Sequence, residues 1–491
     1  ASLGQMIDQR LLGQGAEPVE TGRVDRFRLS GASEGAAVGR VFGRMRVAGQ
    51  VIWASDFHEE ATTSGGGGKG RPRPPEPEVT EYSYSVSLAV ALCEGEITTL
   101  GRIWADGREV PKHTLSLRVY KGTQDQLPDA KIEAVEGAGN APAYRGIAYV
   151  VIEDLALGPF GNRVPALSFE VLRPGAPDTV LADGHTRPDM ARAVRGVALM
   201  PGSGEYALAT EVVEVAEGFG RTRLINVNTD DGRADALVAL DQLEDELPRS
   251  RSVVLVVSWF GDDLRAGTCQ LRPKIEQFGT EASLPWRVSG LDRASAQTVA
   301  DLDGSPVYGG TPTDPSVVQM VQALRARGQE VVFYPFILME QMAGNTRPDP
   351  YTGQPGQPPL PWRGRITTSR AWGVAGTPQE TAAADAEVAA FFGTAQTSDF
   401  DPGSDTVGYD GPDEWSYRRF ILHYAHLCAA AGGVDAFCIG SEMRGLTTIR
   451  GAGGGYPAVD RFRTLAAEVK AILPEAKVGY AADWSEYHGH Q

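Results

Sequence analysis

The sequence predicts a multidomain α+β protein in which a mostly antiparallel β domain precedes an α/β domain built on a parallel sheet. Two observations carry this prediction. Polar and apolar residues alternate with period two from Glu81 to Val90, which is typical of a strand with one buried face. From about residue 253 onward, helices with an apolar stripe are each followed by an apolar strand, a pattern that predicts parallel strands joined by helical crossovers.

The length and composition are those of a chain with several globular domains. At 491 residues the chain has room for roughly three domains, and its 42% apolar and 8% aromatic residues are ordinary for globular proteins. The longest apolar runs, such as 253–257, fall short of the ~20 residues that a membrane-spanning helix needs. The first residues lack the basic region and apolar core of an export signal. We therefore expect no membrane span and no signal peptide.

The net charge and the cysteine spacing argue against several classes of function. The formal charge of −17 argues against general nucleic-acid binding, because Lys and Arg drive the binding of phosphates. An acidic surface would, however, suit a conduit through which DNA slides without sticking. Cys93, Cys269, Cys428 and Cys438 show no C-x-x-C spacing, which predicts buried thiols in a reduced compartment rather than a zinc site or a redox pair. The sequence indicates no cofactor and no metal.

The N-terminal segment, residues 1–60, predicts β structure. Residues 40–53 predict two short strands that turn at Ala48-Gly49. Residues 61–78 are rich in Gly and Pro and have no apolar anchor for a core, so they predict a disordered linker. A phosphate-binding loop is excluded there, because Thr63 and Gly70 stand where its first Gly and its Ser or Thr are required.

Residues 79–175 predict the antiparallel β domain, and residues 176–250 a connector that leads into the next domain. Strand-like runs follow the first one at 98–105, 116–120, 148–153 and 167–172. Asp106-Gly107 is a hairpin-turn dipeptide. No residues of this domain have the spacing of a catalytic site.

Several stretches of the β domain are distinctive: 86–95 (VSLAVALCEG), 102–107 (RIWADG), 120–128 (YKGTQDQLP), 144–149 (YRGIAY) and 160–165 (FGNRVP). With residues 37–57, they resemble the hub region of phage tail-tip proteins, the host-specificity or central tail-fibre proteins of long-tailed phages. They are similar to the family found in gene transfer agents, phage-like particles that package host DNA. In that family the same chain continues into a glycoside-hydrolase-like barrel.

The C-terminal half, residues 251–491, predicts alternating strands and helices. Strand 251–260 is followed by a helix over 314–327, with Asp314 as its N-cap and Pro315 in its first turn, and then by strand 331–338. A Pro- and Gly-rich excursion covers 343–380. An amphipathic helix from Tyr417 to Cys428 leads to a strand that ends on Glu442, and helix 458–473 leads to strand 477–482.

Acidic residues stand just past these strands: Asp262, Asp263, Glu340, Glu442, Asp483 and Glu486. Such a ring favours a barrel over an open dinucleotide-binding sheet, which would need a G-x-G-x-x-G motif. Trp259, Trp484 and Tyr487 stand nearby and are candidates for stacking on sugar rings. The local balance of 16 Asp and Glu against 8 Lys and Arg over 380–491 suits neutral ligands such as glycans. An alternative to a binding site stays open, in which the carboxylates cap helices and the Trp residues cover the core.

Four stretches of the C-terminal half carry a second resemblance: 200–206 (MPGSGEY), 257–265 (VSWFGDDLR), 361–365 (PWRGR) and 437–442 (FCIGSE). They resemble the barrel of gene-transfer-agent tail-tip proteins, which is similar to retaining β-mannanase-like hydrolases of the large (β/α)8 glycosidase clan. This resemblance implies a TIM-barrel glycosidase-like fold for 251–491 and makes Glu442 the general acid/base after the fourth strand. Ser441 stands where the clan has an Asn that contacts the sugar 2-hydroxyl. We therefore expect Trp259, Asp262, Asp263, Ser441 and Trp484 to bind substrate.

The clan places the second carboxylate of its retaining mechanism on the seventh strand. This sequence reaches about the fifth, so the resemblance implies a C-terminally truncated barrel whose nucleophile lies beyond Gln491, and hence a piece of a longer protein. His488 and His490, with Glu486, lack a distant third ligand and predict no metal site. His423 and His426 are expected on the more polar side of their helix, without a partner at ligand spacing.

The resemblance implies a structural tail-tip subunit that forms a homotrimeric hub around the DNA-ejection channel and carries a glycosidase-like barrel to the host envelope. Its expected partners are the distal tail protein, other hub and baseplate subunits, host-envelope glycan and a cell-wall peptidase. DNA is expected to pass without specific binding, and the particle to be assembled in the cytoplasm. Two alternatives remain, a stand-alone retaining glycoside hydrolase and a glycan-binding module with a non-catalytic barrel.

Overall fold

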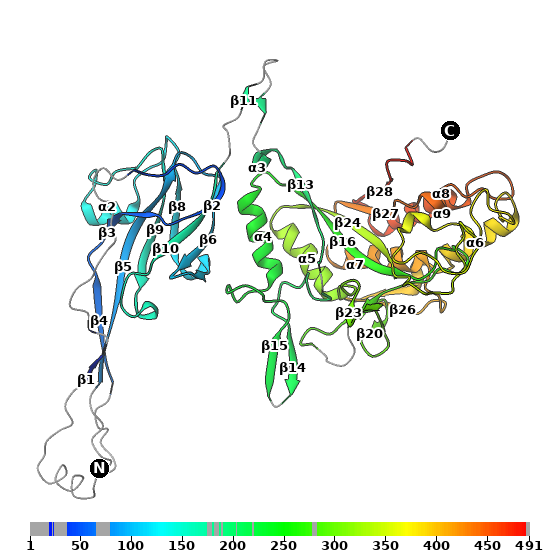
Figure 1. Cartoon of the computed structure of the whole chain (residues 1–491), viewed down its shortest axis with the longest axis horizontal. Helices are drawn as coiled ribbons and strands as arrows, with labels where there is room; N and C mark the ends of the chain where they lie inside the picture. Colours follow the sequence, from blue (N-terminus) through cyan, green and yellow to red (C-terminus); the bar gives the residue numbers. More distant parts are fainter. Residues whose placement is uncertain are drawn as a thin grey trace, which may run out of the picture. The chain divides into compact units, whose positions relative to one another are not determined.

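The computed structural model of the chain describes residues 19–21, 23, 37–64, 79–173, 179–180, 186–187, 190–202, 204–218, 220–276 and 282–487. The chain divides into two compact units, Ala1–Ala193 and Val194–Gln491. Figure 1 draws the first unit in blue to cyan-green and the second in green to red. Among the described residues, no helix is both long and apolar enough to cross a membrane.

The first unit is built from two mostly antiparallel sheets. One runs in the order β1-β5-β9-β8, with β3 and β4 also paired to β5, and the other in the order β2-β10-β6-β7. The strands are β1 (Val19–Thr21), β2 (Gly43–Val47), β3 (Gln50–Ala54), β4 (His58–Ser64), β5 (Val79–Glu94), β6 (Thr99–Ala105), β7 (Arg108–Val110), β8 (Ser116–Lys121), β9 (Ile147–Ala156) and β10 (Leu167–Arg173). Short elements complete the unit: α2 (Ala130–Glu136), β11 (Thr179–Val180), β12 (Thr186–Arg187) and α3 (Met190–Ala193).

The larger sheet of this unit is buried on both faces. Leu88 of β5 and Val150 of β9 pack toward the smaller sheet, against Phe169 of β10. The alternate residues Tyr149 and Val151 pack on the opposite face, with Ile132 of α2. This alternation is the period-two pattern of the sequence, and it fixes the strand register because a slip of one residue would exchange the two faces.

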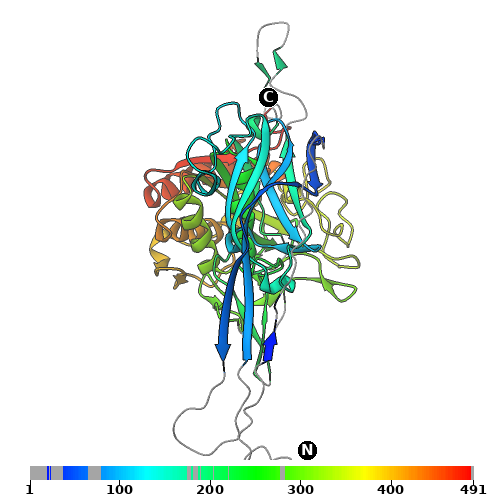
Figure 2. The same cartoon turned by 90° about the vertical axis from the view of Figure 1, so that its left-hand side faces the viewer.

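Strand β5 is unusually long, at 16 residues, and has different neighbours along its length. Its first half pairs with β4 and its second half with β9, with the change at Ser85. Figures 1 and 2 both show the β4–β5 ribbon extending beyond the rest of the sheet. All of β4 is exposed.

The structure refines three expectations for this unit. Two strands do flank Ala48-Gly49, but they join different sheets, since β2 pairs with β10 and β3 with β5. Asp106-Gly107 forms the predicted hairpin turn between β6 and β7, with positive φ at both residues. Strand β4 continues to Ser64, so regular structure extends into the predicted linker, whose remainder, 65–78, lies outside the described residues.

The second unit contains a parallel sheet whose strands follow one another in sequence order, β13-β16-β24-β27-β28. These strands are β13 (Gly196–Leu199), β16 (Ser252–Gly261), β24 (Glu330–Met339), β27 (Ala436–Ser441) and β28 (Lys477–Ala481). The connecting helices are α4 (Asp235–Glu246), α5 (Asp314–Ala326), α6 (Ala382–Phe392), α7 (Tyr417–Ala430), α8 (Arg444–Thr447) and α9 (Pro457–Ile472). The parallel sheet with helical crossovers is confirmed. Within the described residues it stays open and does not close into a barrel.

The two faces of this sheet are covered differently. Val331, Phe333 and Ile337 of β24 are buried in the core formed with the helices. The alternate residues Tyr334 and Phe336 are only half-buried. One face of the sheet therefore packs against helices, as in one side of a (β/α)8 barrel, while the other remains partly accessible.

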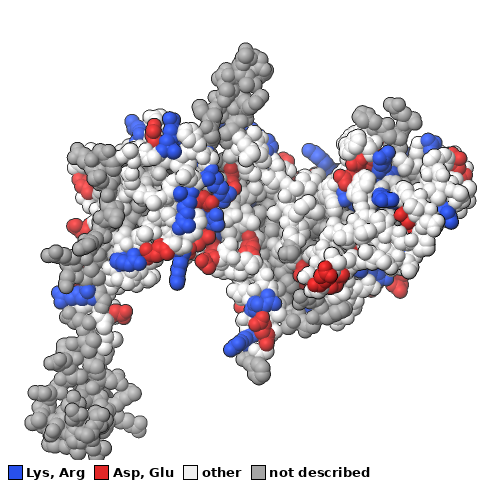
Figure 3. Space-filling view, in the orientation of Figure 1, with Lys and Arg blue, Asp and Glu red and all other residues white. Residues whose placement is uncertain are grey.

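Smaller strands decorate the second unit. They are β14 (Glu214–Gly218), β15 (Arg221–Leu224), β17 (Leu271–Arg272), β18 (Lys274–Ile275), β19 (Arg287–Val288), β20 (Leu291–Asp292), β21 (Gln297–Thr298), β22 (Asp301–Leu302), β23 (Ser305–Pro306), β25 (Phe400–Pro402) and β26 (Val407–Tyr409). The hairpin β14–β15 carries an ion pair between Glu217 and Arg223 at 2.7 Å. On the face shown in Figure 3, acidic and basic side chains are interspersed, on this hairpin as elsewhere, rather than gathered in a large patch of one sign.

Two predictions for α5 and α7 are wrong. Thr313, not Asp314, is the N-cap of α5, and Asp314 is the first helical residue. The Asp314 carboxylate is fully buried and lies 3.0 Å from His423 Nε2. His423 therefore lies in the core with a partner, and not on a polar face, because the apolar side of α7 is wider than its sequence pattern suggests.

Candidate functional site

Acidic residues follow the carboxyl ends of four neighbouring parallel strands. Asp262 and Asp263 follow β16, Glu340 follows β24, Glu442 follows β27 and Asp483 lies two residues past β28. Because the strands are parallel and adjacent, these residues lie along one edge of the sheet. Glu442 follows the fourth parallel strand, counting from β13.

Glu442 has an unusual backbone conformation. Its φ is 51°, in the left-handed region that non-glycine residues seldom adopt. Its backbone N–H donates to the carbonyl oxygen of Ala481 at 2.8 Å, which ties the end of β27 to β28. The side chain is 37% exposed. The backbone strain thus directs a carboxylate toward solvent at the edge of a buried strand, which is a common feature of functional sites.

Two donors from the 343–380 excursion hold this carboxylate. Arg363 Nη2 lies 2.7 Å from Glu442 Oε2, and Trp362 Nε1 donates to the same oxygen at 3.1 Å. Both hydrogen bonds are accepted by the same oxygen, Oε2. Trp362 is itself 40% exposed, so part of its ring remains available beside the carboxylate.

Arg363 is buried and held from several sides. Its guanidinium lies over the ring of Phe336 at 3.8 Å, and Nε donates to the carbonyl oxygen of Ser441 at 2.9 Å. Nη2 also donates to Ser441 Oγ at 2.7 Å, and that hydroxyl lies 2.5 Å from the hydroxyl of Tyr334. Burial lowers the pKa of Arg363 from its ordinary value, while the charge of Glu442 opposes that shift. Ser441 is therefore a buried link in this network and does not present its hydroxyl to a ligand.

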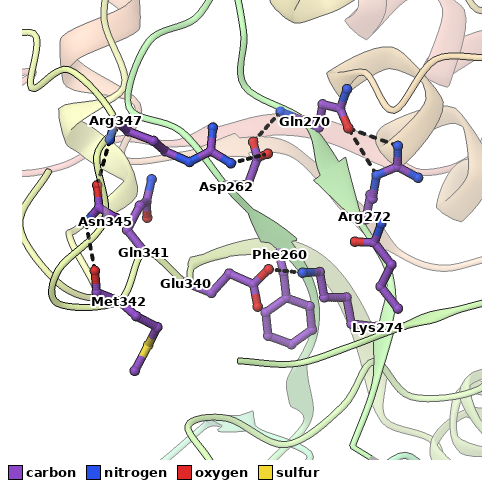
Figure 4. A pocket seen from close by; sticks show the side chains of 11 residues that line it. Phe260, Asp262, Gln270, Arg272, Lys274, Glu340, Gln341, Met342, Asn345 and Arg347 are labelled. Atoms are coloured by element: carbon purple, nitrogen blue, oxygen red, sulfur yellow. Dashed lines mark hydrogen bonds and ion pairs between the residues drawn. The ribbon is translucent and has the colours of Figure 1, made fainter. Parts of the chain in front are cut away.

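A pocket of about 390 Å³ opens at the ends of β16 and β24 (Figure 4). Its lining is mostly polar and comprises Phe260, Asp262, Gln270, Arg272, Lys274, Gln297, Glu340, Gln341, Met342, Asn345 and Arg347. Two ion pairs cross it. Lys274 Nζ contacts Glu340 Oε1, and Arg347 Nη2 lies 3.1 Å from Asp262 Oδ2. The volume lies within the range of small-molecule sites.

Asp262 and Asp263 have different surroundings. Asp262 lines the pocket. Asp263 is fully buried and accepts hydrogen bonds from Arg265, Thr268 and Gln357. Burial alone would raise the pKa of Asp263, but these donors outweigh burial and lower it. Asp263 therefore stabilises the loop after β16, and the expectation that it binds substrate is wrong.

The predicted Trp platforms also differ from one another. Trp259 is fully buried and donates from Nε1 to the hydroxyl of Tyr424 at 3.1 Å. It cannot stack on a sugar, because its position in β16 directs it to the helix-covered face. Trp484 is 80% exposed and Tyr487 is 74% exposed, so both rings are accessible. Glu486 accepts from Tyr480 and Thr447 and so joins β28 to α8.

Sequence reasoning missed Arg363 and Trp362 as site residues. Their motif, 361–365, was distinctive in the sequence, but no local pattern connects it with a carboxylate some 80 positions later. Metal binding has no candidate in the part of the chain that the structure describes, since no three His, Cys, Asp or Glu side chains gather there. His488 and His490 lie outside the described residues.

Comparisons with known proteins identify the family of this chain. The model of the gene transfer agent TIM-barrel-like domain matches residues 415–491, which include Glu442. Among solved structures, the chain is similar to a chain of the virion of a native gene transfer agent particle, with 33% identity over 67% of this chain and 80% of that chain and a TM-score of 0.28. No curated protein matches the sequence.

Two structures of a GH113 β-1,4-mannanase are more distant. The complex is 16% identical over 48% of this chain and 47% of the mannanase, with a TM-score of 0.23. The second structure is 16% identical over 50% of this chain and 49% of the mannanase chain, with a TM-score of 0.24. Likeness at this level does not bear on chemistry. The identity to the virion protein, over four fifths of its length, does show the family: the chain belongs to the gene transfer agent particle proteins that carry a TIM-barrel-like domain.

Proposed function

We propose that this particle component forms the hub of the tail tip and carries a glycosidase-like (β/α)8 domain that cleaves host-envelope glycan, with Glu442 as general acid/base. The observation that supports this most directly is the position of Glu442. It is a strained, partly exposed carboxylate after the fourth parallel strand, held by two side chains that approach from a separate segment.

The proposed chemistry is that of a retaining glycosidase. Glu442 would protonate the leaving-group oxygen and then activate water, while a second carboxylate about 5–5.5 Å away acts as nucleophile. Arg363 orients Glu442 through Oε2, which leaves Oε1 for the proton transfer, and the exposed part of Trp362 offers an apolar surface to a sugar ring.

The test uses particles that carry the natural chain, with release of reducing ends from host-envelope polysaccharide as the readout. Glu442→Gln keeps the shape of the side chain and removes the transferable proton, so we expect a rate loss of ~10²–10⁴. Glu475→Gln is the matched control, because Glu475 is exposed and lies before β28, at the opposite edge of the sheet. Equal activity of Glu442→Gln and the unmodified particle would refute the acid/base assignment.

Binding of glycan without cleavage is a second candidate. It is favoured by the two hydrogen bonds on Glu442 Oε2, since a carboxylate held in one orientation by an Arg and a Trp donor is suited to positioning a ligand. Here Glu442→Gln would weaken glycan binding and host uptake, while neither the variant nor the unmodified particle would release reducing ends.

The proposed hub role concerns the first unit. We expect a homotrimer around the DNA channel that contacts the distal tail protein, other baseplate subunits and a cell-wall peptidase. Membership in a family of particle proteins supports this, as does the exposed β4–β5 ribbon, in which β4 pairs with β5 alone among the described strands and so has an edge suited to pairing with a neighbour. Sedimentation velocity should show self-association as the concentration rises. A monomer at all concentrations would contradict the proposal.

A further inference from the structure

The pocket at the ends of β16 and β24 is lined by three cationic side chains but only two carboxylates. It is lined by Arg272, Lys274 and Arg347 against Asp262 and Glu340. Lys274 pairs with Glu340 and Arg347 with Asp262. Within the described part of the chain, Arg272 has no carboxylate at ion-pair distance.

Arg272 is held in place by neutral groups. Its Nε and Nη2 both donate to the single side-chain oxygen Oε1 of Gln270, at 3.1 and 2.9 Å. Its guanidinium lies over the ring of Trp415 at 4.7 Å. Burial lowers the pKa of Arg272 from its ordinary value, with Asp262 and Asp413 opposing the shift from a distance. The side chain is thus fixed and partly desolvated at the pocket wall, without a direct counter-charge. Figure 4 shows its two hydrogen bonds to Gln270.

We infer that this pocket binds the carboxylate of an acidic sugar, a uronate unit of the glycan, through Arg272. A planar guanidinium matches a carboxylate with two parallel hydrogen bonds, and Arg272 Nη1 makes none with the described residues. The side-chain amide nitrogen of Gln270 makes no hydrogen bond with the described residues, so it can donate to a sugar hydroxyl. This inference rests on the proposed contact with glycan and adds the class of sugar.

The pocket is also joined to the Glu442 site. The carbonyl oxygen of Gln341 accepts a hydrogen bond from Leu360 N at 2.8 Å. Two residues later, Trp362 donates to Glu442. One segment therefore connects the pocket with the proposed catalytic carboxylate along the same edge of the sheet, so that a single oligosaccharide could occupy both.

The test is calorimetric binding of trigalacturonate and of its methyl ester to the intact chain. The ester keeps the hydroxyls and removes the negative charges. We expect the acid to bind at least tenfold more tightly than the ester, and salt to weaken the acid only. Arg272→Gln should lose about tenfold or more in affinity for the acid and leave the ester within about twofold. Arg325→Gln is the control, because it removes the same charge from an exposed position on α5.

A second variant guards against a folding defect at Arg272. Gln270→Glu keeps the Arg272 guanidinium but places a carboxylate beside it. This variant should weaken binding of the acid to the same extent as Arg272→Gln. Equal binding of acid and ester, unchanged binding by both variants, or no binding of either ligand would overturn the inference. If particles still hydrolyse a neutral glycan in a Glu442-dependent way, only the acidic-sugar inference fails; if no glycan is bound or cut, the proposed function fails with it.

Discussion

Arg363 and Glu442 form an ion pair of 2.7 Å in which the cation is buried and the carboxylate is partly exposed. The pair joins the 343–380 excursion to the end of β27. Because the same guanidinium also binds the carbonyl and hydroxyl oxygens of Ser441, the orientation of Glu442 depends on a residue that is far away in the sequence.

Replacement of Arg363 should therefore lower the stability of the second unit and disturb the orientation of Glu442. Arg363→Gln removes the ion pair and the hydrogen bond to the buried carbonyl oxygen of Ser441, so we expect the free energy of unfolding of the second unit to fall by about 1–3 kcal/mol. Arg363→Lys should not restore it, because one ammonium group cannot reproduce the planar set of donors. Hydrogen exchange of the β27 amides would measure the change. Arg365→Gln is the control and should have little effect on β27, because Arg365 lies in the same short 3-10 helix, Arg363–Arg365, but is stacked on Tyr351.

Glu170 predicts an acid-sensitive contact in the first unit. Burial alone would raise its pKa, but hydrogen bonds from Arg44 and Arg102 outweigh burial and lower the pKa to about 2, from an ordinary 4.5. A pKa that is lower in the folded state stabilises the fold above pH 4.5, and this stabilisation is lost as the pH falls from 4.5 toward 2.

Glu170→Gln should accordingly destabilise the first unit by roughly 1–3 kcal/mol at neutral pH, a value that allows for the partial exposure of both Arg side chains. The difference from the unmodified chain should shrink toward pH 2. Urea unfolding at a series of pH values would measure it, with Glu94→Gln, an exposed residue at the end of β5, as the control. A difference that is independent of pH would exclude the ion-pair explanation.

The cysteines should be unreactive in the folded chain. Cys93, Cys269 and Cys428 are buried and Cys438 is half-buried, which agrees with the prediction from their spacing. Burial raises the pKa of Cys438 to about 11 and also raises the pKa of the other thiols. Since the thiolate is the reactive form, iodoacetamide at pH 8 should label none of the four quickly, and all four in urea. Rapid labelling of Cys438 in the folded chain would contradict this.

Local patterns predicted four of the five parallel strands, because each of the four is a short apolar run bounded by clear turn signals, whereas β13 lies in the segment interpreted as a connector. The predicted strand 331–338 is β24, Glu330–Met339, and the predicted helix 458–473 is α9, Pro457–Ile472. Helix α6 was missed because its many alanines give little periodic contrast, although Val388, Phe391 and Phe392 are buried. The periodic signal depends on contrast between faces, and α6 has little of it.

The site was less predictable than the fold. A run such as β16 is apolar on both faces, so the sequence could not show that Trp259 packs under the helices while Phe260 lines the pocket. The partners of Glu442 come from a Pro- and Gly-rich segment without periodicity, and only the folded chain brings Arg363 to the end of β27. Residues just past a strand can be identified from sequence, whereas the side chains that contact them from distant loops cannot.

Glu442 has a left-handed backbone conformation, and we predict that this conformation lowers the free energy of unfolding. At φ 51°, a residue with a Cβ is strained by about 1–2 kcal/mol, whereas Gly is not. Both Glu442→Ala and Glu442→Gly remove the carboxylate and its bond to Arg363. The difference between these two variants therefore isolates the backbone, and we expect the Gly variant to be more stable by about 1 kcal/mol in unfolding free energy.

The matched pair at Glu475, whose φ is not positive, should give the opposite order, with Ala at least as stable as Gly. Unfolding in urea, measured for all four variants, would show whether the order reverses between the two positions. If Ala is as stable as Gly at Glu442, the backbone there is not strained. If the order reverses and both Glu442 variants also lose glycan hydrolysis, the strained backbone is a stability cost that the chain retains in order to present this carboxylate.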